Sequence, residues 1–218
     1  MRFRLFLITI GAVIVALVFT LPTWEPTLRG ATTGNIAFEV FPGLATRYQQ
    51  DFSLLLQEQQ DAYFNLAVTD TGMAIAAIEG YLAPPVAAPD ESLLFEIPSS
   101  AVIAATGNFS TLSPIARAAG SVTIYQDVDN SKTVRFEDFD VANGPNLRVI
   151  LSASANPTTA DEMRLNGIEV DLGALIGTYG NQNYSIAPEI DLRNYRSIVI
   201  YSASIDMIYT VAPLRILV

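Results

Sequence analysis

Two absences limit the chemistry that this 218-residue chain can perform, because it contains neither cysteine nor histidine. Thiolate nucleophiles, disulfides, cysteine-based metal sites and a Ser-His-Asp arrangement are therefore excluded. Lys132 is the only lysine, and it falls in a predicted hairpin loop, so a Ser-Lys dyad would have to form at an exposed tip. We expect that the protein is not an enzyme and carries no cofactor.

A run of oxygen-bearing residues around Asp127 and Asp129 is a candidate calcium site, with Asn130 and Ser131 as further oxygen donors. The spacing departs from an EF-hand loop, which requires a glycine at its sixth position and a distal glutamate. Asp and Asn are also the ordinary residues of hairpin turns. The turn interpretation is favoured over a metal site.

A second acidic cluster contains Glu137 and Asp138. Strand alternation sends Glu137 to the polar face and Asp138 to the opposite face, unless a bulge intervenes. An inward-facing carboxylate requires a partner, because burying an unpaired charge is costly. We expect a structural salt bridge, with Arg135 or Arg148 as the partner.

Residues 120–151 alternate between apolar and polar side chains on both sides of a polar turn, which predicts a β-hairpin. The turn at residues 143–146 precedes another apolar strand, and further short strands follow at regular spacing. Pro213 is expected at a strand end or edge, since proline cannot donate to a ladder. The pattern predicts a mainly β protein, with an antiparallel β-sandwich or jelly-roll-like domain.

The same region resembles the DM13 domain over residues 106–218, with segments in family order. Among the residues that carry the resemblance are Phe136, Asp138, Phe139, Asn143, Gly144, Pro145, Asp171, Leu172, Gly173, Gln182, Tyr184 and Pro213. The resemblance implies a small extracellular or membrane-associated β module, for which electron transfer is proposed on account of one characteristic cysteine.

The resemblance places that cysteine at Ser202. A hydroxyl cannot form a thiolate, a sulfenic acid or a disulfide, so cysteine redox chemistry is not possible at this position. Met207 is the only soft ligand in the segment, and a thioether without a second soft ligand is a weak haem or copper site. We expect that Met207 fills the core.

Residues 5–23 are apolar and uncharged, and about 19 residues at 1.5 Å each can cross a hydrocarbon core of about 30 Å. Arg2 and Arg4 precede this stretch and Trp24 follows it, which predicts a cytoplasmic N-terminus. A cleaved signal peptide is the alternative, but no A-x-A-like cleavage site is present. We favour an uncleaved, single-pass signal-anchor in the plasma membrane.

The predicted organisation has five parts. They are a transmembrane signal-anchor at 1–23, a juxtamembrane linker at 24–42, a helical region at 43–83, a Pro/Ala-rich spacer and lead-in at 84–105, and a DM13-like β domain at 106–218. The helical region is expected to begin near Gly43 as one helix that breaks at residues 70–72, before a second short helix.

The net charge of −10 makes nucleic-acid binding unlikely to be the function, because an acidic surface repels phosphate backbones. We expect a membrane-anchored extracytoplasmic module with a non-catalytic binding or structural role, whose partner would be an extracytoplasmic protein. The alternative is a redox-associated module of the DM13 type that works without the cysteine.

Overall fold

The computed structural model describes residues 40–89 and 100–217. The chain divides into two compact units, Met1–Pro42 and Gly43–Val218, and the fold described here is that of the second unit. Within the described residues, no helix is both long and apolar enough to span a bilayer. The predicted transmembrane stretch at residues 5–23 lies outside them, so it stays a prediction.

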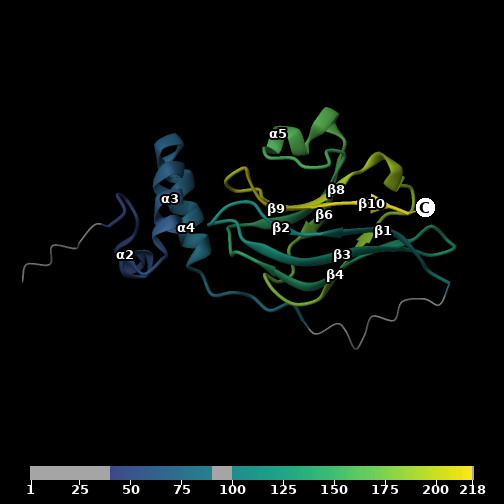
Figure 1. The fold of residues 1–218 in the computed structure, drawn as a ribbon, viewed down its shortest axis with the longest axis horizontal. Helices are drawn as coiled ribbons and strands as arrows, with labels where there is room; N and C mark the ends of the chain where they lie inside the picture. The colour runs from purple at the N-terminus through teal and green to yellow at the C-terminus, as the bar shows by residue number, and fades with distance from the viewer. Residues whose placement is uncertain (1–39, 90–99, 218) are drawn as a thin grey trace, which may run out of the picture. The chain divides into compact units, whose positions relative to one another are not determined.

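The second unit contains three helices followed by two antiparallel five-stranded sheets, and a further short helix, α5 (Ala160–Met163), lies within the strand region (Figure 1). The strand orders are β10-β1-β3-β4-β7 and β2-β9-β8-β5-β6. The strands are β1 (Val102–Asn108), β2 (Ser110–Thr111), β3 (Ala118–Gln126), β4 (Lys132–Val141), β5 (Leu147–Ser152), β6 (Glu169–Ala174), β7 (Gln182–Ile186), β8 (Ser197–Ser202), β9 (Met207–Pro213) and β10 (Arg215–Ile216). The predicted mainly β, sandwich-type fold is confirmed.

Alternation along β3 and β4 builds the first half of the core. Val122 and Ile124 of β3 are buried and lie opposite Phe136 and Val134 of β4. Side chains at every second position share a face of a sheet, so this register turns four apolar residues inward together. The predicted hairpin is therefore confirmed.

Four aromatic side chains fill the centre of this sheet's inner face. The ring of Phe136 lies 4.8 Å from Phe109, 5.0 Å from Phe139 and 5.3 Å from Tyr184, measured between centroids. Several of these rings meet edge-to-face or tilted, which suits the charge distribution of aromatic rings. Large apolar areas are thus buried around one residue of β4.

A bulge lies in β4 at Asp138, directly after Glu137. The β3–β4 register shifts next to Gly120, and both Gly120 (φ 111°) and Asp138 (φ 51°) have left-handed backbone conformations. The bulge leaves Asp138 exposed. Because the bulge turns Asp138 outward, the salt bridge expected for an inward-facing Asp138 does not form. Arg135 pairs with Glu137 at 3.0 Å, and Arg148 pairs with Asp171 of β6 at 2.6 Å.

The helical region holds three helices rather than the two predicted: α2 (Thr46–Ser53), α3 (Gln57–Thr69) and α4 (Thr71–Tyr81). The first break comes at Leu54–Leu56, where the Gln59 side chain accepts a hydrogen bond from the Leu56 amide at 3.2 Å and satisfies a free helix-start donor. The second break, near Asp70, was predicted. Asp70 Oδ1 accepts from the Met73 amide at 2.9 Å and caps α4.

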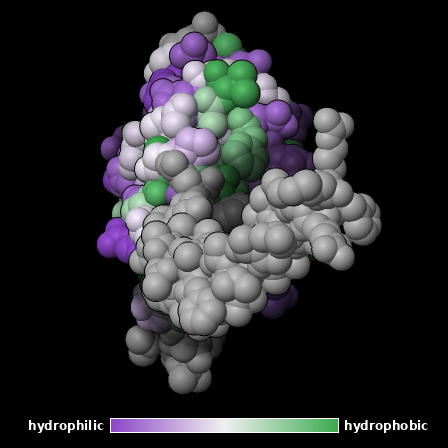
Figure 2. All heavy atoms as spheres, turned by 90° about the vertical axis from the view of Figure 1, so that its left-hand side faces the viewer, coloured by the Kyte–Doolittle hydropathy of each residue, from purple (hydrophilic) through white to green (hydrophobic). Residues whose placement is uncertain are grey.

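The helices leave large apolar side chains exposed. Leu54, Leu56, Phe64 and Val68 are exposed by 75%, 63%, 38% and 87% respectively. Figure 2 faces this end of the second unit and shows apolar residues gathered among hydrophilic ones. Single exposed apolar residues are ordinary, but two in α3 and two in the break before it form a notable apolar surface.

The described part of the spacer, residues 84–89, forms hydrogen bonds with the sandwich. The Val86 carbonyl accepts from the Thr178 amide at 2.7 Å, and the Ala88 amide donates to the Tyr179 carbonyl at 2.8 Å. A Cβ on Gly177 would lie 2.7 Å from Ala88 Cα, so only glycine permits this close approach. The contact holds this part of the spacer against the loop before β7.

Candidate functional site

Ser202, where the resemblance places a cysteine, is the last residue of β8 and is fully buried. Its hydroxyl donates a hydrogen bond to the backbone carbonyl of Pro145. Its backbone lies opposite Leu147 of β5 and Met207 of β9. The hydroxyl therefore joins the end of β8 to the turn before β5, and it is closed to solvent.

The turn at residues 143–145 also contacts the helical region. The side-chain amide of Asn143 donates to the carbonyl of Ala83 at 2.5 Å. A Cβ on Gly80 of α4 would lie 2.6 Å from Cδ of Pro145, which is closer than real Cβ atoms come. The family-type turn thus supports the packing of α4 against the sandwich.

A buried tyrosine, Tyr209, lies beside this turn, and it interacts with a second buried tyrosine, Tyr63 of α3. A Cβ on Gly144 would lie 2.7 Å from Cε1 of Tyr209, so glycine is needed where the turn meets this ring. Burial raises the pKa of Tyr209 far above its ordinary value. Burial also raises the pKa of Tyr63, and the neighbouring Tyr209 and Tyr81 raise it further. Both phenols stay neutral at physiological pH and act in packing.

A polar cluster forms directly beside Ser202. The phenol of Tyr201 donates a hydrogen bond to the carboxylate of Asp206. Nη2 of Arg164 donates to the phenol oxygen at 2.5 Å and to Asp206 Oδ1 at 3.0 Å, and its guanidinium carbon lies 5.3 Å from the Tyr201 ring centroid. Three residues from separate segments therefore share one hydrogen-bond network.

This network shifts the pKa values of Tyr201 and Asp206 in opposite directions. Burial, followed by the hydrogen bond to Asp206, raises the pKa of the Tyr201 phenol. The hydrogen bond from Tyr201, followed by that from Arg164, lowers the pKa of the Asp206 carboxyl. At neutral pH the phenol is protonated and the carboxylate is charged, which is the arrangement of a proton donor with its acceptor.

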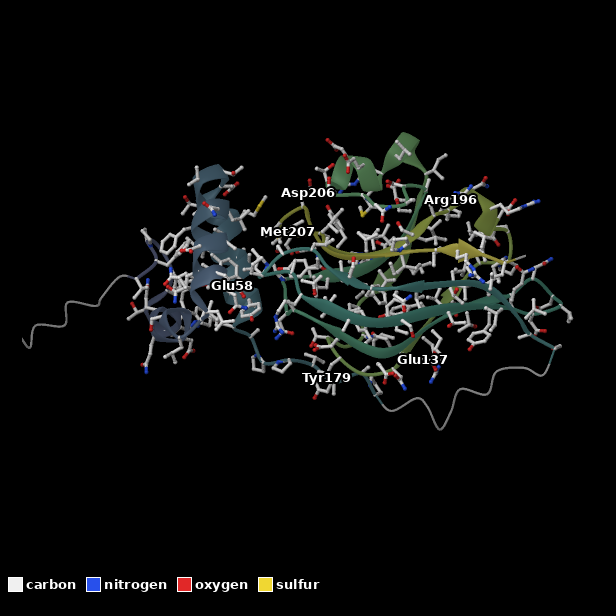
Figure 3. All side chains as sticks on the ribbon, viewed as in Figure 1. Glu58, Glu137, Tyr179, Arg196, Asp206 and Met207 are labelled. Carbon is white, nitrogen blue, oxygen red and sulfur yellow. The ribbon has the colours of Figure 1, made fainter. Side chains whose placement is uncertain are left out.

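Met207 lies at the end of the sandwich that is nearest the helices (Figure 3). It lines a cavity of about 520 Å³, together with Met73 and Leu66 from the helices and Ile208 from β9. Met207 was expected to be core filler, but it lines this cavity. The sequence reasoning missed Met73, because nothing in the helical pattern indicates that α4 approaches β9.

Most of the family-motif residues have structural roles. Phe136, Phe139 and Tyr184 belong to the aromatic core. The buried Gln182 side chain donates to the Gly177 carbonyl at 3.0 Å and accepts from the Tyr184 phenol at 2.6 Å. Such satisfied buried polar groups hold a loop in one conformation, because each partner would be costly to leave unpaired.

The other motif segments also fix backbone geometry. Asp171 accepts from Nε of Arg148 at 2.6 Å and from the Gly173 amide at 2.9 Å, where Gly173 has a φ of 123°. Leu172 between them is half-buried. Pro213 ends β9, as predicted from its inability to donate to a ladder.

The two calcium candidates accept hydrogen bonds within their own turn. Asp127 accepts from the Val128 amide at 2.7 Å, and Asp129 accepts from the Ser131 amide at 2.8 Å. Hydrogen bonds from Ser131 lower the pKa of Asp129. In residues 40–89 and 100–217, no group of three or more acidic, His or Cys side chains could hold a metal ion. The geometry agrees with the turn interpretation.

A comparison with protein-family models identifies residues 108–214 as a match to the family described as "Electron transfer DM13". No match was found among curated proteins or among solved structures. The matched range begins at the last residue of β1 and ends just after β9, so it covers most of both sheets. The C-terminal half of this chain is therefore a DM13 domain.

Proposed function

We propose that this protein is a membrane-anchored, extracytoplasmic DM13 module with a binding or structural role, and that it is not an enzyme. One observation carries the proposal: the Ser202 hydroxyl is fully buried and bonded to the carbonyl of Pro145. At the position that the resemblance assigns to a redox cysteine, the side chain instead holds two segments of the sandwich together.

The composition supports the same proposal. Cysteine redox chemistry proceeds through a thiolate, and no cysteine is present anywhere in the chain. A serine hydrolase requires a base beside its nucleophile, and the chain has no histidine. The only lysine, Lys132, has its ammonium bonded to two backbone carbonyls. These features favour binding over catalysis.

The anchoring part of the proposal rests on the sequence. The uncharged stretch at residues 5–23 follows Arg2 and Arg4, which favours a single plasma-membrane span with the DM13 domain outside. Protease added to intact cells or spheroplasts should then digest the domain. Protection until the cells are lysed would place the domain in the cytoplasm and refute this topology.

The Tyr201 cluster favours one alternative, in which the domain transfers electrons without cysteine. Tyr201 would lose one electron to an external one-electron acceptor of high potential while its phenolic proton moves to Asp206. The existing phenol–carboxylate hydrogen bond supplies the path for that proton. An extracytoplasmic redox protein would be the partner in this case.

Voltammetry of the purified domain separates the two functions. The binding function predicts no reversible wave at ordinary biological potentials, and no radical signal in electron paramagnetic resonance after mild oxidation. A wave that disappears in Tyr201→Phe would favour electron transfer through this phenol. A wave that disappears in Ser202→Ala would refute the proposed structural role of Ser202.

A further inference from the structure

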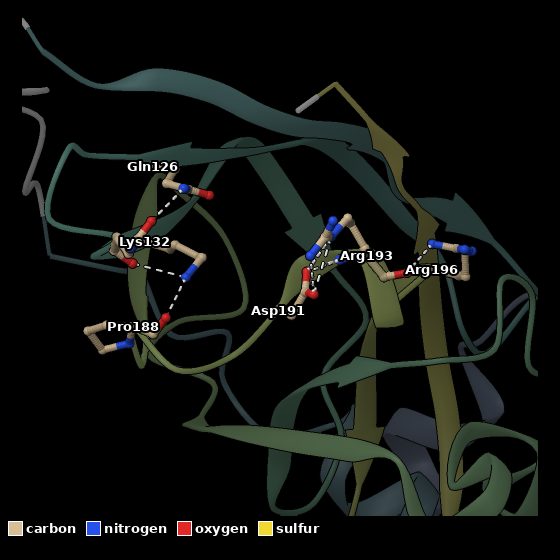
Figure 4. Close-up of polar contacts among 7 residues, drawn as sticks. Gln126, Lys132, Pro188, Asp191, Arg193 and Arg196 are labelled. Atoms are coloured by element: carbon tan, nitrogen blue, oxygen red, sulfur yellow. Dashed lines mark hydrogen bonds and ion pairs between the residues drawn. The ribbon is translucent and has the colours of Figure 1, made fainter.

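The single lysine of the chain is buried rather than placed at an exposed hairpin tip. Lys132 begins β4 and is 6% exposed. Its ammonium donates to the carbonyl of Asn130 at 2.9 Å and to the carbonyl of Pro188 at 3.0 Å (Figure 4). An ammonium has three N–H donors, so one has no partner among the described residues.

No described carboxylate forms an ion pair with this ammonium. The four ion pairs between described residues all involve arginines. Neutral carbonyls satisfy hydrogen bonds, but they do not neutralise a buried charge. An anion beside Lys132 would therefore gain a charge-assisted hydrogen bond that the protein itself does not supply.

Lys132 also lines a cavity of about 380 Å³, which is within the size range of small-molecule sites. The polar part of the wall comes from the β3–β4 hairpin and from Glu189, Asp191 and Arg193. The remaining wall is largely apolar and is formed by Pro188, Ile190, Leu192 and Ile216. The cavity therefore has two charged donors, of which Arg193 is paired with Asp191 and Lys132 has no carboxylate partner among the described residues, and an apolar surface beside them.

The other charges of the cavity favour a ligand with one negative charge. Asp191 is bonded to Nε and Nη2 of Arg193, the latter at 2.8 Å, and these bonds lower its pKa to about 2. The positive charge of Lys132 makes a smaller contribution to this lowering. Asp191 is thus negatively charged at physiological pH, and its charge in the cavity wall disfavours ligands that carry several negative charges.

We propose that this cavity binds a small organic monocarboxylate with an apolar body. The carboxylate accepts the third N–H of Lys132, and the apolar body lies against Ile190, Leu192 and Ile216. The site goes beyond the proposed role of the DM13 domain and does not depend on Ser202, so either can fail without the other.

The single lysine makes the test direct, because lysine labelled with ¹⁵N or ¹³C at its side-chain end gives one resonance from the whole chain. Benzoate and benzamide are the probes, since they share a ring and differ in charge. Benzoate should shift the Lys132 resonance until the shift saturates. The dissociation constant should be on the order of 1 mM, as for other ligands of this size. Benzamide and sodium chloride should not.

Two variants locate the binding. Lys132→Met removes the charge at similar length, and it should weaken benzoate binding at least about tenfold, followed through backbone amides of residues 189–193. Arg117→Met, which removes an exposed positive charge away from the cavity, should leave the affinity unchanged.

Three results would overturn the proposal. Benzoate and benzamide could shift the lysine resonance equally, inorganic phosphate could bind more tightly than benzoate, or Lys132→Met could bind benzoate as well as the unmodified chain. If Lys132→Met does not fold, the titration of the unmodified chain still decides between a carboxylate site and a lysine that only joins two loops.

Discussion

Replacing Ser202 with alanine tests whether its hydroxyl holds the end of β8 to the turn before β5. The hydroxyl makes the only described side-chain hydrogen bond to the Pro145 carbonyl. Removing one oxygen leaves almost no cavity, so the cost comes from the acceptor that loses its partner. A buried unsatisfied acceptor costs about 1–3 kcal/mol. For a unit of this size, that corresponds to a decrease in Tm of about 2–12 °C.

Urea unfolding followed by circular dichroism measures this change, with an unchanged slope as the sign that both states keep their compactness. Ser185→Ala is the matched control, because Ser185 is exposed on β7 and its hydroxyl has no described partner; it should change stability by less than about 0.5 kcal/mol. If Ser202→Ala is no less stable than Ser185→Ala, the hydroxyl does not hold the turn and the structural reading of Ser202 is wrong.

Three further predictions follow from contacts described above. Gly144→Ala should destabilise the unit by about 1–3 kcal/mol in urea unfolding, because its Cβ would overlap the Tyr209 ring. Arg193→Gln should raise the pKa of Asp191 from about 2 towards its ordinary value of 3.8, measured by carboxyl NMR titration. The pKa of Asp206 is lowered from 3.8 in the folded state, so its stabilising contribution is present above that value and is lost as pH falls through the folded pKa. Asp206→Asn should therefore be less stable than the unmodified chain at pH 7. This difference in the free energy of unfolding should disappear in acid, where Asp206 itself is protonated.

The sheets were the most predictable part, because period-two alternation depends only on neighbouring residues. The hairpin, the strand beginning at Leu147 and the position of Pro213 followed from alternation and turn chemistry alone. The exposure of Asp138 did not follow, because a bulge depends on the register with the partner strand. The extra helix break was missed since the Gln59 side chain that stabilises it looks like an ordinary surface glutamine in sequence.

The candidate sites were less predictable, because their residues meet through distant segments. Lys132 was expected at an exposed tip, and a loop more than fifty residues further along the chain covers it. In the sequence, Tyr201 is distinguished only by its position beside Ser202. Its partners, Arg164 and Asp206, carry no local signal in the sequence. Asp206 lies in the turn after β8, and only the packing of the segment after β5 against β8 brings Arg164 to this pair.

The hydrogen bonds between residues 86–88 and residues 178–179 have a consequence for self-association. Residues 178–180 lie beside the end of β4, where the Val141 amide donates to the Thr178 carbonyl at 2.8 Å. An uncovered edge of this kind offers free donors and acceptors to a second chain and is a starting point for aggregation. Here the spacer occupies those groups, and Pro84, Pro85 and Pro89 have no amide hydrogen with which to extend the ladder outward. The segment that links the helices to the DM13 domain therefore also protects this edge from pairing with another molecule.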